Sequence, residues 1–367
     1  MFKTLLLISL AFSCVVFATE YNTINGKRDT PIVTRAPKVF DIDLNASYRD
    51  RWAPVLDEFG ADLKAFIDHL GVSDKAQKIL ALLDKVDYPV IEAYNKEFAQ
   101  EIKAISDYAG LSFTEVAILN FIYDITAQCT SVLIQDPQGN VFHSRNLDFP
   151  YAPFLANMLF HGRYFRDGKL LYEGISLVGY LGVITGVKPN AFSFSIDQYV
   201  LPGEATKAEN ITNLVMGVAQ IFRRKLSPTY VVRKGFETLN DYDSFVKYLK
   251  ETDTVSRAYY IVAGAKPGQG TVITKYRNSV QNQTSLSYET GRWYVAQSNY
   301  RGDIPDPAND NRATAARDFL NAVGVNGITH QTLLDNVMSI YPVFNNETLH
   351  TTVMQPSTGY INTTIWW

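Results

Sequence analysis

Residues 129–149 read CTSVLIQDPQGNVFHSRNLDF, and this stretch decides the fold. The run TSVLIQ at 130–135 has the composition of a buried strand, and DPQG at 136–139 places proline and glycine where a tight turn favours them. The run VFHSRN at 141–146 then returns along the first. The stretch therefore predicts a β-hairpin with residue 135 opposite residue 141.

The register of this hairpin brings reactive side chains together at its open end. Counting back from the turn places Cys129 near residue 147 and Arg145 near residue 131. Arg145 is then a diagonal neighbour of the cysteine on the same face, roughly 7–8 Å away at the Cα atoms, a gap that a long side chain spans. Asp148 has the opposite parity, so it reaches the same site only if the strand bulges or ends there.

The residues before Cys129 have the periodicity of helices over 47–128. An apolar stripe runs along 55–70 at a spacing of 3.6 residues, which predicts the first helix. Start and stop signals predict three more: one capped by Ser73, one between Pro89 and Gly110, and one over 113–126 with a capping box of Ser112 and Glu115.

Strands and helices alternate irregularly after Cys129. Strand-like runs occupy 172–185, 191–197, 258–263, 271–276, 291–299 and 347–354, and helical patterns occupy 205–224, 228–239, 241–251, 312–323 and 330–339. Short hairpins mixed with paired helices indicate an α+β layered fold rather than a βαβ series.

The first 18 residues have the pattern of a signal peptide. They begin with Lys3, continue through an apolar run too short to span a bilayer comfortably, and reach a small residue at Ala18. We therefore expect a secreted or lysosomal protein. Five glycosylation sequons agree with that compartment: Asn45, Asn210, Asn282, Asn346 and Asn362.

The composition argues against several classes of function. The formal net charge is −3 at pH 7 and no stretch forms a basic stripe, so no nucleic-acid partner is expected. Five scattered histidines and a single mature thiol lack the spacing of a zinc site. The glycine-rich run 264–270 lacks the Lys-Ser/Thr of a phosphate loop and predicts a hairpin turn, so no cofactor is expected.

Cysteine usage is the most informative count. The sequence has two, Cys14 and Cys129, and Cys14 leaves with the signal peptide. The mature protein then has one thiol and no internal disulfide, and in an oxidising compartment that thiol is either buried or used. A structural cysteine and a nucleophile both stay open from this residue alone. His143 is interpreted as a strand residue because the papain-type sequence around the cysteine is absent.

The order Cys-Thr-Ser at 129–131, then Arg-Asn-Leu-Asp at 145–148, resembles the acid ceramidase and N-acylethanolamine acid amidase family. More distantly it resembles bacterial bile-salt hydrolases and penicillin V acylases. The resemblance implies an N-terminal-nucleophile hydrolase, whose fold is an αββα sandwich, here with an extra helical N-terminal part. Similar segments extend from about residue 38 to 354: RWAPVL at 51–56, GYLG at 179–182, TG at 185–186, GRWYV at 291–295 leading to Asn299-Tyr300, and HTTVM at 350–354.

The resemblance also implies that the chain cuts itself. The family cleaves the bond before its cysteine, which here joins Gln128 to Cys129. Cleavage would leave a helical N-terminal (alpha) piece, 19–128, and a catalytic (beta) piece, 129–367. Acid ceramidase joins its halves through cysteines that this chain lacks. An alpha/beta heterodimer would therefore be held by packing, without a disulfide.

Five residues match the catalytic positions of the family. Cys129 would be the nucleophile, and its freed α-amino group, with a pKa near 8 in model peptides, would be the base. Asp148 would hold that amine, and Arg145 would position the substrate carbonyl or the thiolate. Asn299 would donate to the oxyanion. Arg312 would brace the site.

A fatty-acyl amide is the substrate that the resemblance implies. Gly179, Tyr180 and Ile184 match the family's substrate-side loop. The run 178–184 and the stripe 55–70 have two interpretations: both line an acyl channel or make peripheral contact with a membrane, or both belong to the core.

Two family activities compete for this sequence. The lack of linking cysteines and the ending RNLDFP at 145–150 favour N-acylethanolamine hydrolysis, whereas GRWYV at 291–295 and Ile184 favour ceramide hydrolysis. The family has an acidic residue where Gln198 follows Asp197, so recognition of the headgroup is open. We favour the acylethanolamine enzyme. Acid ceramidase activity and a non-catalytic secreted lipid-binding homologue are the alternatives.

Overall fold

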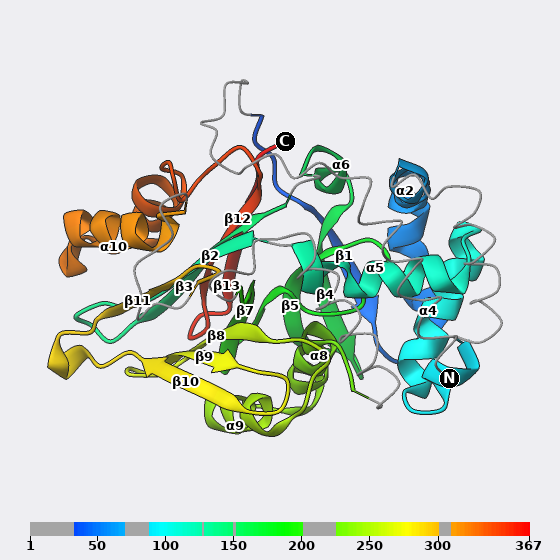
Figure 1. Ribbon diagram of the computed structural model, residues 1–367, viewed down its shortest axis with the longest axis horizontal. Helices are drawn as coiled ribbons and strands as arrows, with labels where there is room; N and C mark the ends of the chain where they lie inside the picture. Colours follow the sequence, from blue (N-terminus) through cyan, green and yellow to red (C-terminus); the bar gives the residue numbers. More distant parts are fainter. Residues whose placement is uncertain (1–32, 70–87, 127, 150–151, 201–224, 301–309) are drawn as a thin grey trace.

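Two β-sheets face each other in the computed structural model. Figure 1 shows helix α10 beside the sheet that contains β2 and β3, and helices α8 and α9 beside the other sheet. The structure describes residues 33–69, 88–126, 128–149, 152–200, 225–300 and 310–367.

The smaller sheet contains the predicted hairpin. Its five strands are antiparallel and have the order β11-β2-β3-β12-β13. Gln135 pairs with Val141 and Cys129 pairs with Leu147, so the predicted register is confirmed. The strands are β2 (Gln128–Gln135), β3 (Val141–Asp148), β11 (Tyr294–Gln297), β12 (Thr348–Gln355) and β13 (Tyr360–Ile365).

The larger sheet has eight strands in the order β1-β4-β5-β6-β7-β8-β9-β10. β1 pairs in parallel with β4, and the other neighbours are antiparallel. The strands are β1 (Lys38–Asp43), β4 (Leu159–Arg166), β5 (Lys169–Leu177), β6 (Thr185–Lys188), β7 (Phe192–Gln198), β8 (Ala258–Gly264), β9 (Gly270–Lys275) and β10 (Val280–Ser285).

Helices cover the outer faces of both sheets and extend one end of the molecule (Figure 1). The α-helices are α2 (Tyr48–His69), α4 (Lys96–Ala109), α5 (Phe113–Thr126), α6 (Ala152–Ala156), α8 (Pro228–Thr238), α9 (Tyr242–Glu251), α10 (Arg312–Val323) and α11 (His330–Leu333). Three shorter turns are η1 (Tyr288–Thr290), η2 (Val325–Gly327) and the π-helical η3 (Leu334–Met338).

Alternation along β2 separates two hydrophobic clusters. Val132 and Ile134 face outward and belong to one cluster with Leu320 of α10. Leu133 faces inward and belongs to another with Ile261 of β8. Because side chains alternate across a strand, each face of the sheet is covered by a different layer. The layers therefore run helix, sheet, sheet, helix, which is the predicted αββα arrangement.

Several local predictions before Cys129 are confirmed. Ser112 and Glu115 exchange both bonds of a capping box, at 2.8 and 3.2 Å. Gly110 ends α4 in the left-handed conformation with φ 66°. The stripe at 55–70 is buried along α2 over its described residues, so the core interpretation is correct there. The helix capped by Ser73 lies outside the described residues, as do the helix over 205–224 and residues 1–18.

Other predictions need correction. The run 172–185 is two strands, β5 and β6, because Gly179 turns the chain with φ 78°. The N-terminal part is not only helical, since β1 lies in the larger sheet. β1 is an edge strand whose side chains are mostly exposed, so its sequence lacks the clear alternation that would have predicted it. β4, β10 and β13 were not predicted either.

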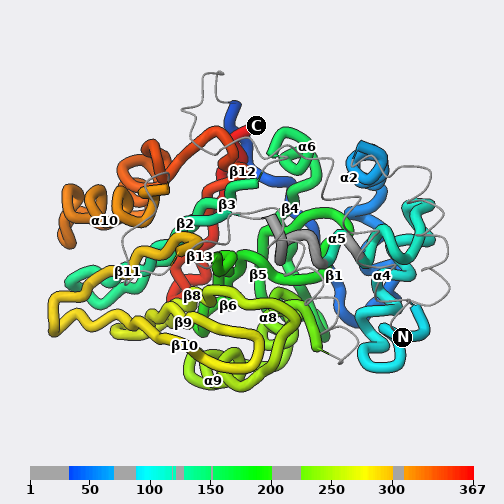
Figure 2. Tube along the Cα trace, in the orientation of Figure 1, coloured from blue at the N-terminus to red at the C-terminus, as the bar shows by residue number. Residues whose placement is uncertain are grey.

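The N-terminal strand runs beside elements that come much later in the chain. Figure 2 shows β1 in blue beside β4 in green, and the start of the described chain close to its red end. Arg35 exchanges two backbone hydrogen bonds with Ile365, at 3.1 and 2.8 Å. Residues 35–43 therefore join both sheets, because Ile365 is in the smaller sheet and β4 is in the larger one.

Three of the five sequon asparagines are exposed, namely Asn45, Asn282 and Asn362. Asn346 is half-buried, and Asn210 lies outside the described residues. None of the helices within the described ranges is both long and apolar enough to cross a membrane.

Candidate active site

Cys129 is the second residue of β2, and its side chain is fully buried between the sheets. Its inward face follows from the register, since residues opposite each other in a sheet share a face. Arg145 of β3 points the same way, and its Nη2 lies 2.9 Å from Cys129 Sγ. Nη1 donates to the hydroxyl of Thr185 at 2.8 Å, and Nη2 also contacts the carbonyl of Ile196 at 3.2 Å. The guanidinium thus connects the nucleophile candidate to the facing sheet.

Asp197 of β7 is a second charged group beside the thiol. Its Oδ1 lies 3.8 Å from Arg145 Nη2 and accepts the hydroxyl of Ser131 at 2.8 Å. Burial raises the pKa of Asp197 to about 7, against the lowering effects of Arg145, Ser131 and the hydrogen-bonding thiol of Cys129. A carboxyl group with such a pKa can accept or donate a proton near neutral pH.

A chain of buried hydroxyls leads from Asp197 to His143. Ser131 Oγ lies 2.8 Å from Ser195 Oγ, which lies 2.8 Å from His143 Nε2. Nδ1 of the same ring contacts Ser193 at 3.0 Å. Burial and then the charge of Arg145 lower the pKa of His143 to about 3, so the ring is neutral. His143 is a strand residue, as expected, but it also supports the polar layer behind the thiol.

Arg312 begins α10 and contacts the main chain of Cys129. Its Nη1 donates to the Cys129 carbonyl at 3.0 Å and to Asp148 Oδ2 at 2.8 Å. Its Nη2 donates to Asn299 Oδ1 at 2.9 Å and to Gln128 Oε1 at 3.1 Å. The side chain therefore touches both residues of the predicted cleavage site as well as two other predicted site residues.

Asp148 lies on the outward face of β3 and pairs with Gln128. The pairing of β2 with β3 has no bulge, but β3 ends at Asp148. A strand end is one of the two conditions under which Asp148 was expected to reach the site. Burial raises the pKa of this carboxyl, whereas Arg312 and the hydroxyl of Thr348, at 2.7 Å, lower it. Asp148 is thus connected to Cys129 through Arg312. Its role in holding the amine stays a prediction.

Asn299 lies directly beside the backbone nitrogen of Cys129. Its Oδ1 accepts from that nitrogen at 2.9 Å, and its Nδ2 donates to the carbonyl of Gln198 at 2.9 Å. An amide NH₂ has two hydrogens, so one remains to be donated to a substrate oxyanion. The predicted oxyanion role is compatible with this orientation and stays a prediction.

The sequence is similar to those of several named amidases. None of the family models compared with the sequence matches it. The chain is 32% identical over 320 residues to the N-acylethanolamine-hydrolyzing acid amidase of Rattus norvegicus, covering 87% of this chain and 85% of the relative. It is 31% identical over 326 residues to the enzyme of that name from Oryctolagus cuniculus, covering 89% and 88%.

The chain belongs to the acid ceramidase and N-acylethanolamine acid amidase family. Mus musculus acid ceramidase is 27% identical over 342 residues, covering 87% of this chain and 83% of the relative. The solved structure of a Caenorhabditis elegans N-acylethanolamine-hydrolyzing acid amidase ortholog superposes with a TM-score of 0.56 at 29% identity, covering 62% of this chain and 93% of that one.

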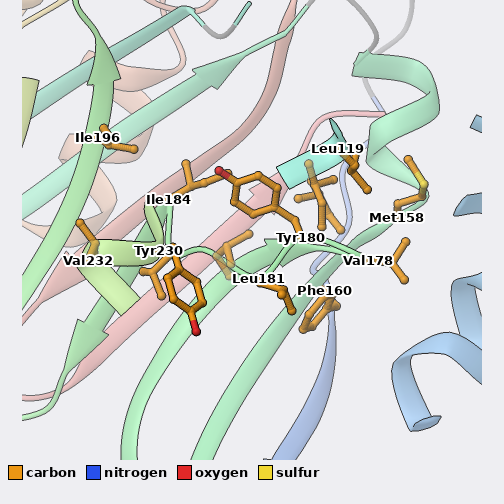
Figure 3. Packing of buried hydrophobic residues seen from close by; sticks show 14 of the residues in the cluster. Leu119, Met158, Phe160, Val178, Tyr180, Leu181, Ile184, Ile196, Tyr230 and Val232 are labelled. Carbon is orange, nitrogen blue, oxygen red and sulfur yellow. The ribbon is translucent and has the colours of Figure 1, made fainter. Parts of the chain in front are cut away.

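The residues matched to the family's substrate-side loop lie inside the core. Gly179 takes a left-handed turn, and Tyr180 Oη lies 2.7 Å from the hydroxyl of Thr229. Ile184 accepts a backbone bond from Ile196 at 3.2 Å, which brings this loop next to the Arg145 contact. Figure 3 shows Tyr180 and Ile184 among buried hydrophobic side chains. Lining of an acyl channel by these residues stays a prediction.

Sequence reasoning missed part of the site of this amidase family member. The sequence pattern does not identify Asp197 as part of the site, and it does not predict the contacts of Thr185 and Thr348. Asp310, which bonds Arg312 Nε at 2.8 Å and Nη2 at 2.6 Å, was also missed. Strand parity could have found Asp197, because alternate residues of one strand share a face: Ser193, Ser195 and Asp197 all point toward the hairpin.

Proposed function

We propose that the protein is an amidase that hydrolyses the amide bond of N-acylethanolamines to a free fatty acid and ethanolamine, with Cys129 as the nucleophile. The observation that carries this proposal is the buried thiol with Arg145 Nη2 at 2.9 Å and Asn299 Oδ1 on its own backbone nitrogen. The relatives above 30% identity support the substrate class, because they are named N-acylethanolamine-hydrolyzing acid amidases.

Maturation would supply the general base. Cleavage of the Gln128–Cys129 bond converts the amide nitrogen of Cys129 into an amine with a lone pair. Asn299 accepts a hydrogen from that nitrogen, and Arg312 binds the carbonyl of the same residue, so the amine would keep a fixed orientation. It would take the proton of the thiol, and the thiolate would attack the acyl carbonyl. The resulting thioester would then be hydrolysed by water.

The two pieces would stay associated without a covalent link. Residues 35–43 form backbone hydrogen bonds with both sheets of the C-terminal piece. Glu101 of the N-terminal piece is fully buried between Arg51 and Arg233, and Arg233 belongs to the C-terminal piece. The strand pairing supports a stable heterodimer, and separating the pieces would also leave the buried charges of the ion pair without their partners.

We also propose a lysosomal or extracellular site of action. The composition of residues 1–18 and the exposure of Asn45, Asn282 and Asn362 support it. Peripheral contact with a membrane stays a prediction, and the buried residues of α2 do not supply it.

The test is intact-mass analysis of the secreted protein after incubation at roughly pH 4.5 and pH 7.5, beside Cys129→Ala. Two chains, the second starting at Cys129 and absent from the variant, are expected. The cut protein is then assayed with an N-acylethanolamine and a ceramide of the same acyl length. Faster release from the ceramide would reassign the substrate to the ceramidase type. A single uncut chain without activity would support the lipid-binding alternative.

A further inference from the structure

Asp197 is a buried carboxyl group that the proposed hydrolysis leaves without a role. It is fully buried in β7 and faces the hairpin that bears Cys129. Ser131 donates to its Oδ1, and its Oδ2 has no hydrogen-bond partner among the described residues. An oxygen in that position has a lone pair available for a proton.

Self-cleavage needs a proton acceptor other than the α-amine. In the intact chain the nitrogen of Cys129 is an amide, and it donates to Asn299 Oδ1 at 2.9 Å. An amide nitrogen has no basic lone pair, so it cannot take the proton of the thiol. The base that serves the mature enzyme therefore does not exist until after the first reaction.

The other ionisable groups around the thiol are poor acceptors. Arg145 is a donor only. His143 is separated from Asp197 by two hydroxyls, and burial keeps its pKa near 3. Asp148 lies on the opposite face of the sheet and bonds Arg312. Among these groups Asp197 alone combines a hydrogen bond to the thiol with an oxygen that can accept its proton.

We propose that Asp197 carries the proton during self-cleavage, taking it from Cys129 Sγ and giving it to the departing nitrogen of Cys129. This inference rests on the proposed function. The thiolate attacks the carbonyl carbon of Gln128, an S–C bond forms and the C–N bond breaks. The nitrogen leaves as a neutral amine with the proton from Asp197. Water then hydrolyses the thioester, which releases the Gln128 carboxyl group and restores the thiol.

Geometry favours this transfer. During the attack Sγ and the nitrogen belong to one five-membered ring, because both are bonded within the same cysteine. A carboxyl group that contacts Sγ therefore lies next to the ring that contains the nitrogen. The hydroxyl of Ser131, itself bonded to Ser195, donates to Oδ1 and so holds the carboxyl group in place beside the thiol. Ser131 and Ser195 are positioning residues in this scheme.

The test measures the cleavage rate by intact mass in the full chain carrying Asp197→Asn. The expected loss is about 100-fold or more, the usual size of a general acid–base contribution. Asp197→Ala should be cut slowly in buffer and faster with added formate, since a small carboxylate can enter the space and carry the proton. A purely structural role would give no such rescue. Glu237→Gln is the matched control. It removes a buried carboxylate that pairs with Arg233 instead of the thiol, and this variant should be cut normally.

The outcomes distinguish the role of Asp197 from the proposed function. If Asp197→Asn cuts at the wild-type rate while Cys129→Ala stays whole, the role of Asp197 is wrong and the proposed function stands. If the wild-type chain also stays uncut, self-cleavage does not occur and the proposed function is wrong. If Asp197→Asn does not fold, the formate response of Asp197→Ala decides, and its absence in a folded chain overturns the proton-carrier role.

Discussion

At the residue scale, the site depends on two arginines that approach Cys129 from different sides. Arg145 contacts the thiol from the inner face, and Arg312 contacts the main chain from the outer layer. Arginine suits both positions because its planar group donates several bonds in fixed directions. The proposed nucleophile is thus held through its side chain and, separately, through its backbone.

Replacing Arg312 with lysine should impair both cleavage and hydrolysis. One ammonium cannot reach Cys129 O, Asp148, Asn299 and Asp310 together, so buried acceptors lose their donors. We expect stability to fall by about 3 kcal/mol, typical for a broken buried pair. Thermal unfolding and the intact-mass time course measure the two effects. Arg317→Lys, in the same helix, is the control and should behave like wild type. Normal cleavage in Arg312→Lys would remove this residue from the machinery.

The sequence predicted the Cys129–Arg145 contact because both residues belong to one hairpin, whose turn sets the register. It could not predict that Arg312 bonds the carbonyl of Cys129 or that Asp197 bonds Ser131. Those contacts join residues from separate layers, and only the packing of the layers decides them. The family resemblance named Arg312, but local pattern alone indicated no more than a helix start.

At the element scale, the turn between β5 and β6 determines how the core meets the site. Gly182 lies in this turn, and a Cβ there would come 2.2 Å from Thr229 Oγ1 and 2.6 Å from Thr229 Cβ. The same threonine hydroxyl contacts Tyr180 at 2.7 Å. The turn and the start of α8 therefore fit together only while residue 182 has no side chain.

Gly182→Ala should destabilise the protein by about 1–3 kcal/mol, the usual result of overpacking a core. Gly60→Ala is the opposite case, because nothing lies within 4 Å of the new methyl group in α2. It should raise stability by up to about 1 kcal/mol, since alanine favours the helix. Melting temperatures of the two variants measure this. Equal shifts would mean that the turn adapts more easily than the packing indicates.

Elements with a strong local signal were predictable, and edge elements were not. The capping box of α5 and the hairpin turn are encoded within a few residues. β1 and β13 are edge strands. Val39 of β1 is apolar yet exposed and Thr363 of β13 is polar yet buried, so the alternation that indicates a half-buried strand is weak. Their pairing depends on partners far away in the sequence.

At the scale of the whole molecule, a buried cluster of charges crosses the boundary between the predicted pieces. Glu101 bonds Arg51 and Arg233, and Arg233 bonds Glu237 at 2.8 Å. Burial alone would raise the pKa of Glu237, but Arg233 and Lys234 outweigh it and lower that pKa to about 2. Burial also opposes ionisation of Glu101, and Arg233 and Arg51 again lower its pKa.

Acid should leave the two pieces together down to about pH 4.5. A carboxylate whose folded pKa is depressed stabilises the protein above its unfolded pKa and loses that effect as pH falls through the folded value. The ordinary pKa of a glutamate is 4.5, and Arg233 and Arg51 hold the pKa of Glu101, the carboxylate that crosses the boundary, below it. We therefore expect association to weaken only as the pH falls below 4.5. Size-exclusion chromatography of the cut protein measures it, and dissociation already at pH 5 would contradict the role of the cluster.

Glu101→Gln should separate the pieces after cleavage. It leaves Arg51 and Arg233 buried without a counter-charge, at a cost of about 3–5 kcal/mol. Native mass spectrometry should find free pieces in this variant and a complex in wild type. Glu58→Gln removes an exposed pair with Lys38 and should leave the complex intact, because surface pairs contribute little. If both variants remain as complexes, contacts other than those of Glu101 hold the two pieces together.

The bridge between Arg35 and Ile365 also sets an order of events during synthesis. Residue 35 leaves the ribosome long before residue 365, so the early strand has to wait for its last partner. Closing so long a loop is slow, and an unpaired edge invites aggregation in the meantime. The nascent chain would therefore depend on chaperones of its compartment until translation ends.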